Sequence, residues 1–101
     1  MKRVMVKYKV KADKAEENAA YVRKVFAELN QNNPSGLRYV TFRLVDGVSF
    51  VHIASVETED GRNPLSETTA FKNFQAEIKE RCEELPTAVE IETIGSYRVF
   101  E

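Results

Sequence analysis

The chain has 101 residues, 43% of them hydrophobic and 31% charged, so it suits a single globular domain and is too apolar for a disordered segment. Its net charge is −1 and its lysines and arginines are spread along the chain, which argues against nucleic acid and anionic membrane as principal partners. No apolar run approaches the roughly 20 residues of a membrane span. The single cysteine, Cys82, excludes an internal disulfide and fits a reducing compartment. We therefore expect one domain over residues 1–101, located in the cytoplasm.

The N-terminal third predicts a strand followed by a helix. In residues 3–11 valine and tyrosine alternate with methionine and lysine, the period of a strand with one apolar face. Asp13, with Glu16 three residues later, offers a capping box for the helix. Apolar residues then recur every three or four positions up to the polar loop 30–36, as in an amphipathic helix. The members of this stripe are Ala15, Ala19, Val22, Phe26 and Leu29.

The stretch Leu37–Glu57 predicts a β-hairpin. Two β-rich runs flank Asp46-Gly47, a pair that readily forms a type I′ turn, and the register of the strands follows from that turn. On one face the expected partners are Tyr39 with Ala54, Thr41 with His52, and Arg43 with Phe50. The other face carries Val40, Phe42 and Leu44 opposite Ser49, Val51 and Ile53.

A loop, a second helix and a last strand follow the hairpin. Asn63-Pro64 or Ser66 is expected to begin the helix, and Pro86 to end it. The apolar stripe of this helix contains Phe71, Phe74, Ile78, Cys82 and Leu85. Ala88–Ile94 alternates as a strand, and Ser96–Phe100 is expected to form a short further strand after Gly95.

The order β-α-β-β-α-β predicts a ferredoxin-like α+β fold, with an antiparallel sheet, both helices on one face, and the first strand between the third and the fourth. We assign to the helix-covered face Val4, Val6, Tyr8, Val10, Val40, Phe42, Val51, Ile53, Val89 and Ile91. The opposite face then gathers Lys7, Lys9, Glu90 and Glu92 beside Tyr39, Arg43, Phe50 and His52. That second face is too apolar to leave in water, so we expect a second copy of the chain, related by a two-fold axis, to cover it.

Three segments carry a resemblance to a known family, namely RVMVKYKVKADKAEE, GLRYVTFRL and SETTAFKNFQAEI. Together they resemble the antibiotic-biosynthesis-monooxygenase-like family of dimeric α+β barrels. The resemblance implies a homodimer whose two sheets enclose a shared cavity, with Ser96–Phe100 suited to reach across to the partner. It also implies cofactor-free oxygenation of electron-rich aromatic or quinol-like substrates. The haem-degrading branch uses an Asn, His and Trp set, whereas this chain has no tryptophan and carries Val56 where members often have one.

His52, the only histidine, is the first candidate for a catalytic residue, because its ordinary pKa near ~6.5 lets it exchange a proton at neutral pH. Two alternatives are an interface histidine and a metal ligand, but no cysteine or carboxylate stands at ligand spacing from it. Arg43 is expected to form an ion pair with Glu90 or Glu92, or to clamp a substrate. Tyr39 and Phe50 either stack on a planar ligand or simply pack. The residues expected to line the ligand are Tyr39, Thr41, Arg43, Phe50 and Lys7.

Two functions are compatible with these patterns. The first is a homodimer that binds a small apolar or aromatic molecule between its sheets and acts as a monooxygenase without metal or cofactor, with His52 accepting a proton. The second is a non-catalytic ligand-binding or interaction module whose cavity is filled by its own side chains. No P-loop, nucleophile elbow or CxxC pair points to another chemistry.

Overall fold

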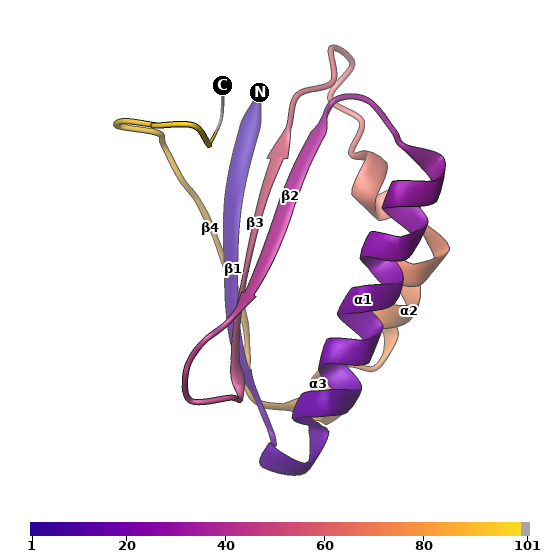
Figure 1. The fold of residues 1–101 in the computed structure, drawn as a ribbon, viewed down its shortest axis with the longest axis vertical. Coiled ribbons are helices and arrows are strands. Elements are labelled where there is room, and N and C mark those ends of the chain that lie inside the picture. Colours follow the sequence, from indigo (N-terminus) through magenta and orange to yellow (C-terminus); the bar gives the residue numbers. More distant parts are fainter. Residues whose placement is uncertain (100–101) are drawn as a thin grey trace.

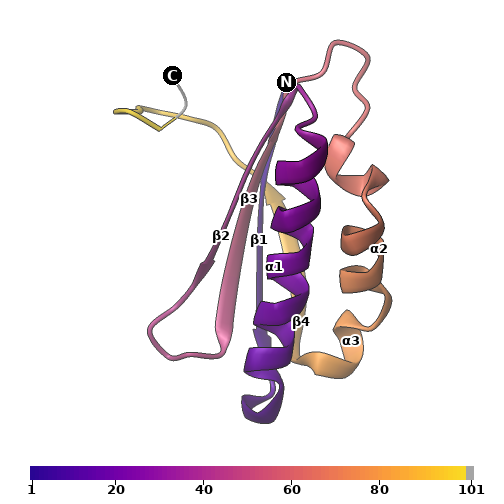
Figure 2. The ribbon, with the colours of Figure 1, turned by 45° about the vertical axis from the view of Figure 1, so that its right-hand side comes forward.

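The computed structural model describes residues 1–99 and has the predicted ferredoxin-like fold (Figure 1). Its strands are β1 (Lys2–Val10), β2 (Leu37–Arg43), β3 (Ser49–Val56) and β4 (Cys82–Glu90), and its helices are α1 (Ala15–Asn32), α2 (Thr69–Ala76) and the short α3 (Ile78–Arg81). The antiparallel sheet has the order β2-β3-β1-β4, so β1 lies between β3 and β4 as predicted. Both main helices cover the same face of the sheet (Figure 2). None of the described helices is long and apolar enough to span a membrane.

The hairpin has the predicted register but a different turn. Thr41 pairs with His52 and Tyr39 with Ala54. Within the turn only Gly47 has a positive φ, of 80°, whereas a type I′ turn needs two such residues. Asp46 instead accepts hydrogen bonds from the backbone N–H groups that follow Gly47, at 3.0 and 2.9 Å. The prediction of a type I′ turn was therefore wrong, although the strands that it joined were placed correctly.

The face assignment of the hairpin was also wrong. Directly paired residues of antiparallel strands share a face. His52 pairs with Val6, and Phe50 pairs with Tyr8, which lies under the helices. His52 and Phe50 therefore lie on the helix side of the sheet, together with Tyr39 and Thr41. Both faces of the hairpin are apolar, so alternation alone did not distinguish them, and only the pairing with β1 decides which one the helices cover.

The opposite side of the sheet, here called the open face, carries the hairpin residues that we had assigned to the helix-covered face, together with Val89. Phe42 is 54% exposed, and Val89 is 44% exposed because it pairs with Met5 and not with a residue under the helices. The apolar side chains of the open face are Met5, Val40, Phe42, Val51, Ile53 and Val89. No described element covers them (Figures 1 and 2).

The second helical region is shorter than predicted. Asn63 caps a 3₁₀ turn (Pro64–Glu67) by accepting a hydrogen bond from Leu65 N–H at 3.0 Å, and Thr68 caps α2. Helical structure ends at Arg81, and β4 runs from Cys82 through Pro86. Pro86 is tolerated because β4 is an edge strand with a register shift at this point, where a missing N–H interrupts no regular ladder.

The remaining differences concern chain ends and caps. A 3₁₀ turn (Ala12–Lys14) precedes α1, so Asp13 does not cap that helix, and Lys14, which stands at the cap position, makes no side-chain capping bond. Residues 91–99 form no strand, and Phe100 lies outside the described residues. Beyond Ile91, whose backbone N–H still bonds to the Arg3 carbonyl, the chain leaves the sheet (Figure 1). Three apolar side chains of this segment are exposed. These exposed side chains are Ile94, Tyr97 and Val99.

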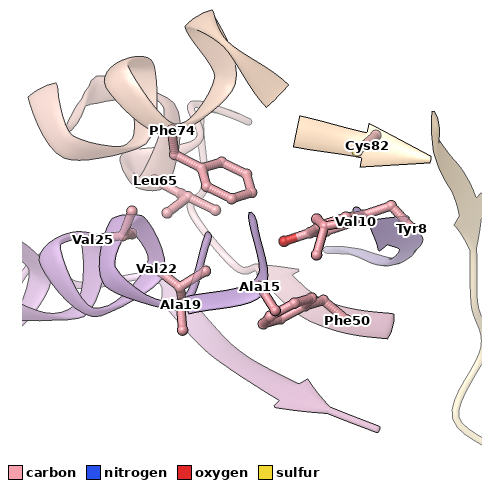
Figure 3. Close-up of a cluster of buried hydrophobic side chains, with 10 residues drawn as sticks. All are labelled: Tyr8, Val10, Ala15, Ala19, Val22, Val25, Phe50, Leu65, Phe74 and Cys82. Carbon is pink, nitrogen blue, oxygen red and sulfur yellow. The ribbon is translucent and has the colours of Figure 1, made fainter. Parts of the chain in front are cut away.

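The core lies between the sheet and the helices (Figure 3). Helix α1 buries small and branched residues at helical spacing, while the sheet contributes the aromatic rings of Tyr8 and Phe50. The fully buried apolar members are Tyr8, Val10, Ala15, Ala19, Val22, Val25, Phe50, Leu65, Phe74 and Cys82. The oxygen of Tyr8 points into the cluster and not toward solvent.

Candidate functional site

A cavity of about 500 Å³ lies between the sheet and α2. Its walls are mostly apolar. Its polar lining residues are Lys2, Tyr8, Tyr39 and His52 on the strands, and Thr58, Asn63 and Gln75 on the loop and helix side. Strands β1, β2 and β3 contribute Val4, Val6, Tyr8, Tyr39, His52, Ala54 and Val56. The helical side contributes Leu65, Phe71, Phe74, Gln75 and Ile78. A concave, largely apolar cavity with a few converging polar groups is the usual form of a small-molecule site.

His52 lies at the polar end of this cavity with both ring nitrogens hydrogen-bonded. Its Nε2 is 2.8 Å from the hydroxyl of Tyr8. Its Nδ1 is 2.6 Å from the hydroxyl of Tyr39 and 2.9 Å from that of Thr41. The ring also stacks between the two tyrosines, with centroids 5.3 and 5.8 Å away. The position and orientation of the imidazole are thus determined from both sides.

The network continues behind Tyr8 to two residues of the helical layer. Asn18, on α1, donates from Nδ2 to the Tyr8 hydroxyl at 2.9 Å. Arg81, at the end of α3, donates from Nε to Asn18 Oδ1 at 3.0 Å and from Nη2 to the carbonyl of Phe74 at 2.9 Å. The guanidinium also lies over the ring of Tyr21, with 4.3 Å between Cζ and the ring centroid. A buried chain of hydrogen bonds therefore links a positive charge to the imidazole.

Burial keeps His52 and the two tyrosines beside it uncharged at neutral pH. Loss of solvent lowers the pKa of His52 to about 4 and raises the pKa of Tyr39 to about 12. The same effect raises the pKa of Tyr8 well above its usual value, although the hydrogen bond from Asn18 opposes it. The end of the cavity at His52 accordingly offers neutral hydrogen-bonding groups, which suit an uncharged, mostly apolar ligand.

Three of the residues predicted for the site come together around one point. His52, Tyr39 and Thr41 are in direct contact, on the helix side of the sheet and not between two sheets as we expected. Phe50 lies behind this group, where its ring stacks on Tyr8 with centroids 5.6 Å apart. It supports the site through Tyr8 and does not line the cavity.

The other two predicted residues lie elsewhere. Arg43 forms an ion pair with Glu16 of α1 at 2.6 Å, and not with Glu90 or Glu92 of the last strand region as expected. Lys7 lies on the open face, where it pairs with Val51 of β3. The sheet itself therefore separates Lys7 from His52. Neither of these basic residues lines the cavity.

Three residues of the network were not singled out from the sequence: Tyr8 was assigned to the core, and Asn18 and Arg81 were not considered. Asn18 has a recognisable signal, since it stands at helical spacing from Ala15 and Val22, and a polar residue inside an apolar stripe needs a buried partner. Arg81 has no such signal. Its burial depends on where the helix ends and β4 begins.

The described residues contain no metal site. Nowhere in residues 1–99 do three or more histidine, cysteine or acidic side chains gather closely enough to hold an ion. Cys82 is buried, and loss of solvent raises the pKa of its thiol, so it lacks the thiolate character of a reactive cysteine. We expected it to act as a small apolar residue, and its place in the core agrees with that.

Comparisons with solved structures show what the fold resembles. An antibiotic biosynthesis monooxygenase matches with a TM-score of 0.75 over 94% of this chain and 100% of its own, at 18% identity. The chain has the antibiotic biosynthesis monooxygenase fold. Rv0793 from Mycobacterium tuberculosis shares this fold, with a TM-score of 0.75 over 94% of this chain and 96% of its own, at 12% identity.

SnoaB, a cofactor-independent oxygenase from Streptomyces nogalater, also has the antibiotic biosynthesis monooxygenase fold. Its TM-score is 0.68 over 96% of each chain, at 13% identity. The resemblance inferred from the sequence is thereby confirmed at the level of the fold. Comparisons with protein-family models and with curated proteins found no match.

Proposed function

We propose that this protein binds a small aromatic molecule in the cavity between the sheet and α2, and that it oxygenates this molecule without a metal or cofactor. The observation that carries the proposal is the apolar cavity of about 500 Å³ whose polar end is the neutral, doubly hydrogen-bonded His52. The name of SnoaB, a cofactor-independent oxygenase with the same fold, supports the type of reaction. The proposal keeps the chemistry expected from the sequence but moves the ligand to the helix side of the sheet.

The proposed reaction begins with loss of a proton by the ligand. His52 accepts this proton directly or through Tyr8 or Tyr39, whose hydroxyls contact its two nitrogens. The resulting electron-rich anion gives an electron to O₂, and recombination forms a carbon–oxygen bond. For an anthrone, the methylene group and O₂ become a carbonyl group and water, so one oxygen atom is incorporated and the proton held by His52 leaves in the water.

Oxygen uptake tests the activity. We expect consumption of O₂ with one or more members of a panel of anthrones and quinols, and loss of most of that uptake in His52→Ala. Lys11→Ala, in an exposed residue outside the cavity, serves as the control. Uptake by the His52 variant at the wild-type rate would remove this residue from the mechanism. Crystals soaked with the most active compound should place it beside His52, under α2.

A non-catalytic binding protein is the second candidate, and the low pKa of His52 favours it. A base whose pKa is about 4 is available in its neutral form at neutral pH but has little driving force to take a proton. In that case the same aromatic compounds bind in the cavity, yet no O₂ is consumed. Binding and oxygen uptake measured on one panel of compounds distinguish the two candidates.

The protein is further proposed to be a homodimer in which a second copy covers the open face. Phe42, at 54% exposed, and Val89, at 44%, are large exposed apolar side chains of that face, and a contiguous apolar surface of this kind usually marks an interface. Lys7 and Lys9 lie on the same side near the acidic residues of β4, and Lys9 is 3.6 Å from Glu83. Two-fold contact places like surfaces together, and this mixture of charges avoids repulsion. The mass in solution tests the assembly.

A further inference from the structure

Arg81 is a buried cation without an acidic partner. It is 1% exposed, and no ion pair among residues 1–99 includes it. Its Nη1 is buried and has no hydrogen-bond partner there, while two aromatic rings, of Tyr21 and Phe74, lie against the guanidinium at 4.3 and 5.2 Å. Isolated buried charge is strongly unfavourable for folding, and an apolar residue of similar volume fills such a site at least as well. The charge is thus better explained by an effect on its neighbours than by stability.

The guanidinium determines how the amide of Asn18 is oriented. Arg81 Nε is only a donor, so the Asn18 atom 3.0 Å away is the acceptor oxygen. The amide nitrogen of Asn18 therefore points to the hydroxyl of Tyr8, to which it donates at 2.9 Å. Because an amide nitrogen cannot accept, the Tyr8 hydrogen has to find its acceptor elsewhere.

That acceptor is His52. Besides Asn18, the side-chain partner of the Tyr8 hydroxyl is His52 Nε2, at 2.8 Å. Tyr8 is 2% exposed, and a buried hydroxyl hydrogen is normally paired. Tyr8 consequently donates to Nε2. A neutral imidazole carries a hydrogen on only one of its two nitrogens. That hydrogen is therefore on Nδ1 and is donated toward Tyr39 and Thr41.

We propose that Arg81 and Asn18 are positioning residues that set the tautomer of His52 and thereby direct every hydrogen of the network from the guanidinium toward the cavity. This series of hydrogen bonds ends at Tyr39, whose hydroxyl oxygen accepts from His52. Tyr39 lines the cavity, and its own hydroxyl hydrogen is offered to a ligand. The ligand class that fits is an uncharged aromatic molecule with a hydrogen-bond-accepting oxygen, such as a ketone. This last step, unlike the tautomer, rests on the proposed function.

The tautomer is directly measurable because His52 is the only histidine in the chain. A long-range proton–nitrogen correlation spectrum of the isotope-labelled protein at neutral pH distinguishes a protonated from an unprotonated ring nitrogen. We expect Nδ1 to carry the hydrogen and Nε2 to carry none. The opposite pattern in the wild-type protein would overturn the inference without any variant being made.

Asn18→Asp tests the causal chain with almost no change of shape. The carboxylate still accepts from Arg81 but cannot donate to Tyr8, so the Tyr8 hydroxyl turns toward it and His52 Nε2 becomes the donor. We expect Nε2–H to become the major tautomer in Asn18→Asp, and both tautomers to be populated in Arg81→Met. Asn73→Asp, the same chemical change at an exposed position of α2, should leave the spectrum unchanged. A wild-type tautomer in a folded Asn18→Asp would contradict the role assigned to Asn18, and an unchanged tautomer in a folded Arg81→Met would contradict the role assigned to Arg81.

The proposed hydrogen bond from Tyr39 to a ligand is tested with two inert probes of similar shape. They are α-tetralone, which has a carbonyl oxygen, and tetralin, which has none. Tyr39→Phe should weaken binding of α-tetralone by about 3- to 10-fold, the value of one hydrogen bond, and leave binding of tetralin unchanged. Equal effects on both probes would overturn the assignment of Tyr39 as donor. Failure of both probes to bind would contradict the proposed aromatic site and, with it, the role of Tyr39 as a donor to the ligand. The tautomer of His52 would still be decided by the nitrogen spectrum of the wild-type protein.

Discussion

The two sides of the sheet differ in the kind of side chain that is buried or exposed. On the helix side, polar groups such as His52 and Tyr8 are buried, and each finds hydrogen-bond partners within the domain. On the open face, large apolar side chains such as Phe42 are left in solvent by the single chain. The comparison separates two functions that we had assigned to one surface: the helix side suits a ligand, and the open face suits another protein surface.

Phenylalanine occurs on both sides, which allows a direct comparison of stability. Phe74 is 6% exposed and touches the rings of Tyr8 and His52, so Phe74→Ala should lower the free energy of unfolding by about 3–5 kcal/mol. Phe42→Ala should cost less than about 1 kcal/mol in the monomer. Urea denaturation measures both. A loss for Phe42→Ala that grows with protein concentration would indicate that a second copy covers the open face.

Acid should destabilise the helix side through His52. Its pKa is about 4 in the folded protein against 6.5 in the unfolded chain, so the unfolded chain binds the extra proton between these values. The contribution of His52 to the free energy of unfolding is therefore fully present above pH about 6.5 and is lost as the pH drops toward about 4. The loss is roughly 3 kcal/mol, at about 1.4 kcal/mol per pKa unit. The groups facing the ring are the uncharged hydroxyls of Tyr8, Tyr39 and Thr41.

Urea denaturation across this pH range measures the effect, with His52→Gln as the comparison. In His52→Gln the free energy of unfolding should depend little on pH above about 5, because the carboxylates with lowered pKa values protonate at lower pH. The carboxylates in question are Glu16, Asp46, Glu57 and Asp60. A slope that persists in His52→Gln would show that another group is buried in its neutral form.

A charge on the open face should separate the proposed dimer. Phe42→Asp places a carboxylate where the two copies meet, and we expect the dissociation constant to rise by about 30-fold or more, equivalent to about 2 kcal/mol. Light scattering after size-exclusion chromatography measures the mass at several concentrations. Val45→Asp, in the exposed hairpin turn outside the sheet, is the matched control. A wild-type protein that is monomeric throughout the concentration range would refute the dimer.

The smallest effect is expected for Lys7→Ala. We predicted Lys7 as a ligand-lining residue, but its side chain lies on the open face, across the sheet from His52. Its removal should change ligand affinity in the cavity by less than about 2-fold, within the usual range for a surface substitution. Titration of the variant and the wild type with the same aromatic compound measures the difference. A large loss would return the ligand to the space between two sheets.

Much of the fold follows from local patterns in the sequence. The alternation in β1, the stripe of α1 and the turn at Asp46-Gly47 are properties of neighbouring residues, and they gave the element order, the strand order and the hairpin register correctly. Helix ends were predicted less well. Cys82 fits both the stripe of a helix and the start of an edge strand, and its pairing with Val10 of β1 decides between them.

Local sequence patterns were thus sufficient to predict a ferredoxin-like domain and a hairpin that places Thr41 and Tyr39 beside His52. The face of that hairpin that the helices cover depends on its pairing with β1, because both faces are apolar and each satisfies the period of a strand. The tertiary structure also decided that Arg81 and Asn18 complete the network. Their contacts join α3, α1 and β1, and the sequence pattern of one segment does not show which other segments lie next to it in the fold.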